Sequence, residues 1–356
     1  MRTLIARSFL ISIAVLLSSC GASENPAQET QIKQSQKGWQ LDIKGDLNSF
    51  FECLEAEDKT LISAHRGGAY PGYPENALES AQYVSSQIPA LYEIDVATSK
   101  DGILYLMHDD TLERTTTGSG KANAATWSEL SQLRLEDKRG KATRFHPPKL
   151  ENFLQWAKGR SLVQIDFKRS TRFEDAIDIV RSTGMENHVI YIAYSMAQAR
   201  KLHRLAPKSM VSVSVDSLSE LNSAIASGID PSKLLAFTGT SNPRPRVFNM
   251  LNSRDVEVIF GTLGGRDAID KDIAAGRSNV TYTELSKAGV DIIATDRPLE
   301  AYKALQKTGR AVDSPICGIS RSRAKRHQGR PRRFSTNCRA MAIEAARSLP
   351  EPAGRS

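Results

Sequence analysis

Short apolar runs alternate with amphipathic segments over most of the chain, between Leu61 and Leu305. Nine runs predict strands, because each has five to seven residues and Gly, Pro, Asn or Asp residues separate them. They lie at 61–65, 91–97, 103–109, 162–167, 188–194, 210–216, 234–239, 256–262 and 290–296. Several segments between them carry apolar residues three and four positions apart, which predicts helices. These segments are 75–87, 173–183, 196–206, 217–228 and 282–290.

This alternation over about 245 residues favours an α/β fold with a parallel sheet, and the length suits a TIM-like (β/α)8 barrel. Nine candidate strands compete for eight places, and the run at 234–239 is the weakest. The link between 91–97 and 103–109 is too short for a helix, so we expect no regular helix between the second and third strands. An open doubly wound sheet is the alternative, but no GxGxxG sequence follows the first strand.

The chain begins with a secretory signal pattern. Two arginines precede the apolar run 9–17, which is too short to span a bilayer as a helix of about 20 residues. The run ends in LSSC, which resembles the lipobox of bacterial lipoproteins, in which the cysteine becomes the lipidated first residue. We therefore expect residues 1–20 to be a lipoprotein signal peptide and Cys20 to anchor the protein to a membrane of the cell envelope. In a diderm bacterium that membrane is the outer membrane, at its periplasmic face. An ordinary cleaved signal peptide is the alternative.

Charge divides the rest of the chain. Residues 21–45 form a polar tether and 46–308 the barrel, whereas 309–356 contains eleven Arg and Lys residues and only three acidic ones. The net charge of +8 therefore belongs to this last segment. A basic tail can bind nucleic acid or anionic lipid, but it has no zinc-ligand spacing, RNA-binding signature or interleaved aromatic residues. We expect a disordered tail with no nucleic-acid partner, and a chain cut after Thr308 that still folds and works.

The composition is that of a globular protein, with 40% hydrophobic and 25% charged residues. Four cysteines are too few for a disulfide framework. Cys53, Cys317 and Cys338 are accompanied by no histidine pattern that indicates catalysis. A disulfide between Cys317 and Cys338 is compatible with an oxidising envelope, although the sequence does not fix it.

Polar side chains interrupt five of the predicted strands at their carboxyl ends. The sequences there are HRGG from 65, EID from 93, HDD from 108, DFK from 166 and TDRP from 295. Residues two apart in a strand share a face, so Glu93 and Asp95 point the same way, as do Asp166 and Lys168. In a barrel that direction is inward, at the rim where active sites lie. Burying such groups without a function is costly, so we expect an active site there.

The residue types indicate the chemistry of this site. Three carboxylates aimed at one small volume repel each other unless a cation lies among them. Oxygen ligands alone favour a hard divalent ion, Mg²⁺ or Ca²⁺, over zinc. Arg66 and Lys168 add positive charge that suits a phosphate group.

The motifs together resemble those of the glycerophosphodiester phosphodiesterase family. They are HRGGAYPGYPENALES, EIDVATSKDGILYLMHDDTLERTTTGSG, QIDFK and ATDRP, and the resemblance covers residues 61–305. It implies a TIM-like barrel that uses one divalent metal ion, Mg²⁺ or Ca²⁺. It also implies hydrolysis of glycerophosphodiesters to glycerol 3-phosphate and an alcohol.

The resemblance also assigns roles by position. It implies that His65 and His108 are the acid–base pair, and that Arg66 and Lys168 contact the phosphate. The implied metal ligands are Glu93, Asp95 and Asp166. Glu75, Asn76 and Asp296 are second-rank candidates, and capping of a helix that starts after Pro74 is the ordinary explanation of Asn76.

Two departures from the family pattern put the substrate range in doubt. Asp166 stands where the family usually has the longer Glu, and residues 146–151 read HPPKLE where the family often has a sequence close to PTLEE. Two other functions remain as alternatives: a phospholipase D-like lyase of the same barrel that forms a cyclic phosphate, and a lipid-anchored binding protein that has lost catalysis. Retention of both histidines and all three acids favours an enzyme. The sequence leaves open the head group, the ion, the route and which histidine is the acid.

Overall fold

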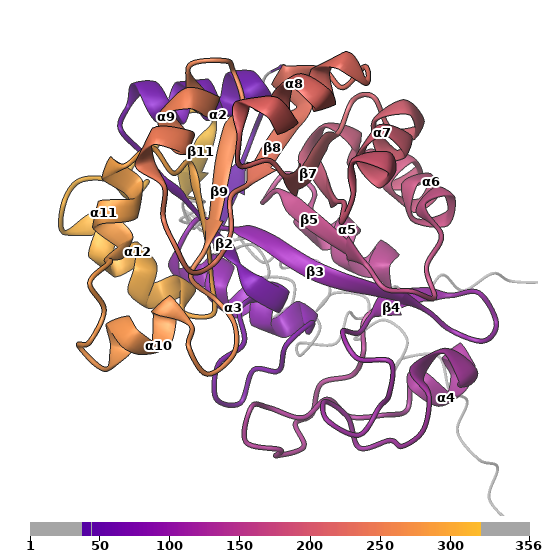
Figure 1. Cartoon of the computed structure of the whole chain (residues 1–356). Coiled ribbons are helices and arrows are strands. Elements are labelled where there is room, and N and C mark those ends of the chain that lie inside the picture. Colours follow the sequence, from indigo (N-terminus) through magenta and orange to yellow (C-terminus); the bar gives the residue numbers. More distant parts are fainter. Residues whose placement is uncertain (1–37, 44, 322–356) are drawn as a thin grey trace, which may run out of the picture. The chain divides into compact units, whose positions relative to one another are not determined.

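The computed structural model describes residues 38–43 and 45–321. Eight parallel strands close into a barrel (Figure 1). In chain order they are β2 (Leu61–Ala64), β3 (Leu91–Thr98), β5 (Val163–Phe167), β6 (Val189–Ile192), β7 (Met210–Ser214), β8 (Leu234–Phe237), β9 (Glu257–Gly261) and β10 (Ile292–Thr295). Pairing of β10 with β2 and of β2 with β3 closes the ring, which confirms the predicted barrel.

The ninth predicted strand lies outside the barrel. β4 (Leu104–Leu106) pairs antiparallel with the end of β3, because a tight turn at 99–103 returns the chain along β3. The extra strand among the nine predictions is therefore 103–109 and not the weakest one, 234–239, which forms β8. The expected absence of a helix between 91–97 and 103–109 is confirmed. His108 accordingly follows an antiparallel hairpin strand and does not end a barrel strand.

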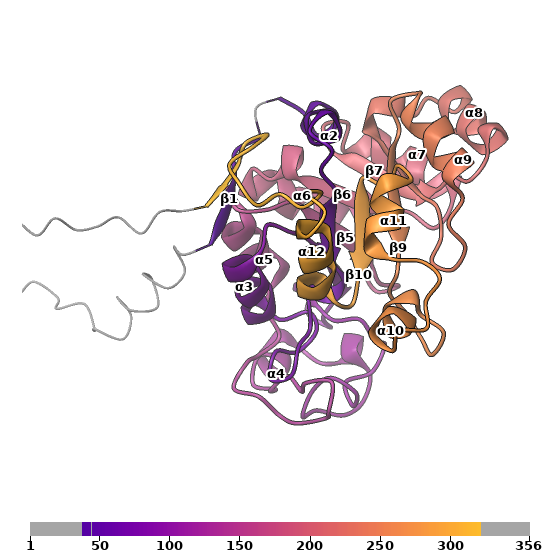
Figure 2. The same cartoon turned by 90° about the vertical axis from the view of Figure 1, so that its left-hand side faces the viewer.

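Helices cover the outside of the barrel (Figures 1 and 2). Those that follow or precede barrel strands are α3 (Leu78–Gln87), α5 (Leu150–Ala157), α6 (Phe173–Thr183), α7 (Met196–Leu205), α8 (Leu218–Ala226), α9 (Pro245–Asn252), α10 (Ile269–Ala274), α11 (Tyr282–Lys287) and α12 (Pro298–Gln306). A short helix α4 (Trp127–Leu130) belongs to the long insertion that follows β4. No helix in the described part of the chain is both long and apolar enough to cross a membrane.

Buried apolar side chains fill the barrel at the amino-terminal ends of the strands. Each strand or the residue before it contributes one: Leu61, Leu91, Leu162, Ile190, Met210, Leu235, Ile259 and Ile292. The same cluster includes apolar residues of α2 (Leu47–Ala56), which covers this floor of the barrel. The acidic residues singled out in the sequence, Glu93, Asp95 and Asp166, lie nearer the opposite end, where the strands finish.

The two ends of the described chain meet beside this floor. β1 (Trp39–Leu41) pairs antiparallel with β11 (Ile319–Arg321) (Figure 2). A disulfide joins Cys53 to Cys317. The predicted boundaries at 45/46 and 308/309 are therefore wrong, because residues 38–43 and 309–321 pack on the barrel. Cys317 is therefore not paired with Cys338, a pairing that the sequence had left open.

Burial of apolar side chains explains why residues 309–321 belong to the barrel and not to a tail. Val312 and Ile319 are 2% and 3% exposed, and Val312 also accepts a hydrogen bond from the Tyr302 hydroxyl. The sequence of 309–321 has too few apolar residues to show a period. The predicted signal peptide with Cys20, most of the tether and the tail beyond Arg321 lie outside the described residues.

Candidate active site

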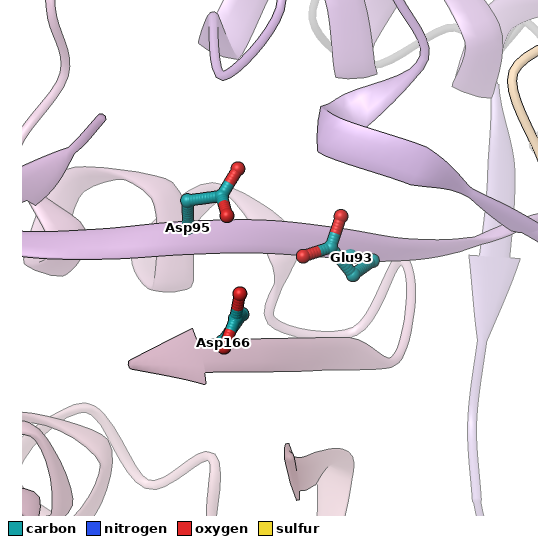
Figure 3. A group of neighbouring side chains, drawn as sticks. All are labelled: Glu93, Asp95 and Asp166. Carbon is teal, nitrogen blue, oxygen red and sulfur yellow. The ribbon is translucent and has the colours of Figure 1, made fainter. Parts of the chain in front are cut away.

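Three acidic side chains converge at the carboxyl end of the barrel. Glu93 and Asp95 project from β3 and Asp166 projects from β5, with Asp95 directly beside Asp166 in the strand register (Figure 3). Each offers a carboxylate oxygen that lies within 4.8 Å of the others, and all three residues are buried. The structure thus brings together the three acids that the sequence singled out, and the alternation along β3 explains how.

Electrostatics of the trio favour a bound cation. Burial, together with the charge of Asp95, raises the pKa of Glu93 to about 8, and burial also raises the pKa of Asp166. The Oδ1 atom of Asp166 is buried and has no hydrogen-bond partner among the described residues. A set of carboxylate oxygens with one unsatisfied buried oxygen fits a hard divalent ion such as Mg²⁺ or Ca²⁺.

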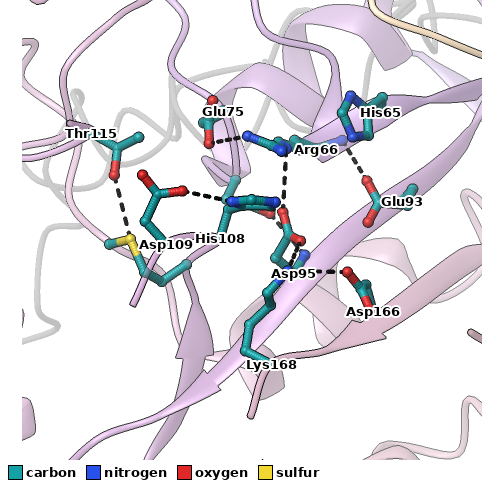
Figure 4. A network of polar contacts seen from close by, with 12 residues as sticks. His65, Arg66, Glu75, Glu93, Asp95, His108, Asp109, Thr115, Asp166 and Lys168 are labelled. Carbon is teal, nitrogen blue, oxygen red and sulfur yellow. Dashed lines mark hydrogen bonds and ion pairs between the residues drawn. The ribbon is translucent and has the colours of Figure 1, made fainter. Parts of the chain in front are cut away.

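Two basic side chains border the acids (Figure 4). The Lys168 ammonium donates to Asp95 Oδ1 at 3.0 Å and to Asp166 Oδ2 at 3.1 Å. Arg66 follows β2 in a 3-10 turn, where its backbone N–H donates to Glu93 Oε2 at 2.7 Å. Its guanidinium Nε lies 3.7 Å from Asp95 Oδ2. Both cations therefore lie beside the acidic trio.

Each predicted acid–base histidine is held by a carboxylate. His65 Nδ1 lies 2.8 Å from Asp296 Oδ1, and His108 Nδ1 lies 2.6 Å from Asp109 Oδ1. Burial lowers the pKa of His65, but the hydrogen bond to Asp296 and the charge of Glu93 outweigh burial and raise it overall. A carboxylate at Nδ1 fixes the ring and leaves Nε2 available to accept or donate a proton.

A further acidic side chain links the two halves of the site. Glu75 accepts a hydrogen bond from Arg66 at 2.9 Å (Figure 4). It also accepts one from Arg114 at 2.7 Å, and Arg114 donates to Asp109 as well. This chain of ion pairs connects Arg66 to His108. The sequence reasoning missed Asp109 and Arg114, although both lie inside the HDDTLERTT motif that supported the resemblance.

Asn76 does not cap a helix, and that explanation is wrong. Helix α3 begins at Leu78, and Asn76 lies before it with a positive φ of 54°. Its side-chain amide donates to Asp95 Oδ2 at 2.7 Å, and its Oδ1 accepts from the Asp95 backbone N–H at 3.0 Å. Asn76 therefore orients Asp95 and is almost completely buried while doing so.

Tyr194 is a site residue that the sequence reasoning missed. It follows β6, and its hydroxyl donates to Asp166 Oδ2 at 2.9 Å while the residue remains 72% exposed. The only sequence signal for it is an aromatic residue at the carboxyl end of a predicted strand, in HVIYIAY.

Comparisons with known proteins agree with the geometry. Residues 65–300 match the model of the glycerophosphoryl diester phosphodiesterase family. A glycerophosphoryl diester phosphodiesterase from Parabacteroides distasonis is 30% identical with a TM-score of 0.69, and the match covers 80% of this chain and 99% of that one.

Two other matches are more distant or shorter. A phosphodiesterase from Oleispira antarctica, solved in complex with the product sn-glycerol-3-phosphate, shares the fold at 20% identity and a TM-score of 0.55, over 70% of this chain and 97% of that one. Glycerophosphodiester phosphodiesterase 1 of Rattus norvegicus is 34% identical over 82 residues, which are 23% of this chain. That match spans only about a quarter of the rat protein's length, 24%.

Proposed function

This chain belongs to the glycerophosphoryl diester phosphodiesterase family, and on that premise we propose that it hydrolyses glycerophosphodiesters to sn-glycerol 3-phosphate and an alcohol. The observation that carries the proposal is the pair of carboxylate-held histidines beside the acidic trio. The product complex of the Oleispira antarctica phosphodiesterase supports the choice of product.

We propose that Glu93, Asp95 and Asp166 hold one divalent cation, Mg²⁺ or Ca²⁺. When bound, such an ion neutralises phosphodiester charge and stabilises the negative charge that builds up during displacement. The support is the unpartnered Asp166 oxygen and the raised pKa of Glu93, both of which a cation would relieve.

The protein groups then divide the remaining work. Arg66 and Lys168 bind the non-bridging phosphate oxygens and hold the diester in place. One histidine accepts the proton of the attacking oxygen at Nε2 as the new bond to phosphorus forms. The other donates a proton from Nε2 to the leaving alcohol oxygen as its bond to phosphorus breaks. Asp296 and Asp109 keep both rings oriented during the transfer.

We also propose that the protein is lipid-anchored in the cell envelope through Cys20. The support is the LSSC sequence after an apolar run, since this part of the chain lies outside the described residues. Labelled palmitate is expected to enter the wild-type protein and not a Cys20→Ser variant. Equal labelling of both, or of neither, contradicts the anchor.

The proposed activity is tested by measuring release of sn-glycerol 3-phosphate from several glycerophosphodiesters. Turnover is expected to stop in EDTA and to return with Mg²⁺ or Ca²⁺, because the trio needs a cation. Full turnover in metal-free buffer contradicts the metal site. Phosphorus NMR of the product distinguishes hydrolysis from the lyase, because a cyclic phosphate as the final product favours the lyase.

A further inference from the structure

A cavity opens at the carboxyl end of the barrel, on loops that follow β7 and β8. It has a volume of about 330 Å³, and among its lining residues are Ser214, Asp216, Phe237, Thr238, Asn242 and Arg244. Because the barrel strands are parallel, this cavity lies at the same end of the barrel as the acidic trio. The volume is in the range of small-molecule sites, about 300–1,000 Å³.

Tyr194 connects the cavity to the acidic trio. Tyr194 follows the end of β6, and Ser214, a lining residue, ends the neighbouring strand β7. The Tyr194 hydroxyl reaches Asp166, and its backbone N–H donates to the Gln198 side chain at 2.8 Å. The exposed ring of Tyr194 is thus held at the trio, after the strand that neighbours β7.

The two charged side chains at the cavity wall, Arg244 and Asp216, neutralise each other. Arg244 Nη1 lies 2.9 Å from Asp216 Oδ2, and both side chains are partly exposed, at 36% and 46%. Arg244 also donates to the Thr238 carbonyl oxygen at 3.3 Å, which holds the pair at the cavity wall. An anionic ligand would compete with Asp216 for Arg244, and a cationic ligand would compete with Arg244 for Asp216. A neutral group with several hydroxyls suits the pair, since each hydroxyl both donates and accepts.

We propose that this cavity, defined by Ser214, Asp216, Thr238 and Arg244, binds the released alcohol of the diester and favours a polyhydroxylated alcohol. The inference rests on the proposed phosphodiesterase function. The glycerol end is common to all substrates, whereas the alcohol varies, and an open cavity on rim loops accommodates groups of different size. The ring of Tyr194 offers an apolar surface against which the C–H face of such a polyol packs.

The test compares two diesters that share the glycerol end. Glycerophosphoinositol carries a polyol, and glycerophosphoethanol carries an alcohol without a further hydroxyl. We expect the wild-type protein to prefer the inositol diester in kcat/KM by about tenfold or more, the scale of one or two hydrogen bonds to charged side chains. Asp216→Asn and Arg244→Gln are each expected to lower this ratio toward one.

Controls separate a local effect from a general one. Lys208→Gln removes a surface ion pair with Glu186 just before β7, at the other end of the barrel, and is expected to keep the wild-type ratio. Melting temperatures show whether each variant folds. If Asp216→Asn does not fold, Arg244→Gln carries the test alone.

Several results would overturn the subsite. A wild-type ratio near one would do so, as would an unchanged ratio in both variants. Equal loss on both diesters would assign the cavity to the glycerol end instead. If neither diester is hydrolysed, calorimetry of the two intact diesters gives an affinity ratio. A preference for the inositol diester then counts against the proposed function alone, and equal affinities count against the subsite.

Discussion

His65 and His108 reach the acidic trio from different directions, one directly after β2 and one after the β4 hairpin. Each ring is held through Nδ1 by a carboxylate that is not part of the trio. Two such histidines at one site allow proton removal and proton donation in the same displacement, because imidazole titrates near neutral pH.

Replacing either histidine therefore removes one proton transfer. His65→Ala and His108→Ala are each expected to lower kcat by about 10²–10⁴-fold, measured as release of sn-glycerol 3-phosphate. His203→Ala, on the outer helix α7, is the matched control and is expected to keep wild-type turnover. Wild-type rates in both site variants would contradict the acid–base assignment.

Asn76 controls the orientation of Asp95 through two hydrogen bonds. Asn76→Gly keeps the positive φ accessible and removes both bonds, so the affinity for Mg²⁺ or Ca²⁺ is expected to fall about 10–100-fold. Calorimetric titration with each ion measures this change. Asp255→Gly, at another position with positive φ, is the control, with a φ of 56° on the surface. Unchanged metal affinity in Asn76→Gly would show that Asp95 needs no such support.

The candidate site was predictable from the sequence where strand alternation determines it. Glu93 and Asp95 lie two residues apart on one strand, so the two-residue repeat of a strand is enough to predict that both side chains point to the same face. Tyr194 and Arg114 were not predictable in this way, because their contacts depend on how loops return over the barrel mouth. Asn76 was misassigned because an asparagine just before a predicted helix looks the same in the sequence whether it caps the helix or is buried beside a carboxylate.

At the scale of elements, the strands were easier to predict than the helices. The strands are continuous apolar runs because helices bury their outer face and side chains fill their inner face. Helices α5, α9 and α12 have eight or nine residues, so each shows only about two turns of its period. β4 has the apolar character of a barrel strand, and only the shortness of the preceding turn indicates its antiparallel direction.

The beginning of β9 carries a buried acid at the barrel floor. Glu257 is 6% exposed. Burial, followed by the charge of Asp291, raises its pKa to about 10. The unfolded chain loses this proton near the ordinary glutamate value of 4.5, whereas the folded chain keeps it. Folding above pH 4.5 therefore requires proton uptake, so stability falls as pH rises through neutrality toward 10.

Glu257→Gln removes this dependence. At pH 8 the variant is expected to have a free energy of unfolding several kcal/mol higher than that of the wild type, because each pH unit above 4.5 costs the wild type about 1.4 kcal/mol, and the difference is expected to shrink toward pH 4.5. Urea unfolding across this pH range measures it. Glu151→Gln on α5 is the exposed control and is expected to leave the profile unchanged. Parallel profiles for wild type and Glu257→Gln would mean that Glu257 is not protonated in the folded protein.

At the scale of the whole molecule, the barrel depends on segments outside it. Residues 309–321 supply Val312, Ile319, one strand and Cys317, all next to the floor and α2. Their sequence is short, contains Gly and Pro, and has a net positive charge, so the composition indicates a tail. Contacts between segments more than 250 residues apart leave no local signal, which explains the misplaced boundary.

A pair of truncations tests the revised boundary. A chain that ends at Thr308 is expected to melt at a much lower temperature than one that ends at Arg321, because it loses the disulfide, worth about 2–4 kcal/mol, and the apolar cover of the floor. Circular dichroism and phosphodiesterase assays measure both chains. Equal melting of the two would restore the original boundary at 308.

The disulfide also constrains the timing of biogenesis. Cys53 precedes every barrel strand and Cys317 follows the last one, 264 residues later. A chain that crosses a membrane amino end first delivers Cys53 to the oxidising side long before its partner arrives. During that interval the thiol of Cys53 must avoid other cysteines, and Cys20 is the nearest along the sequence. Lipidation of Cys20, as proposed, would alkylate that thiol to a thioether and leave Cys53 to wait for Cys317.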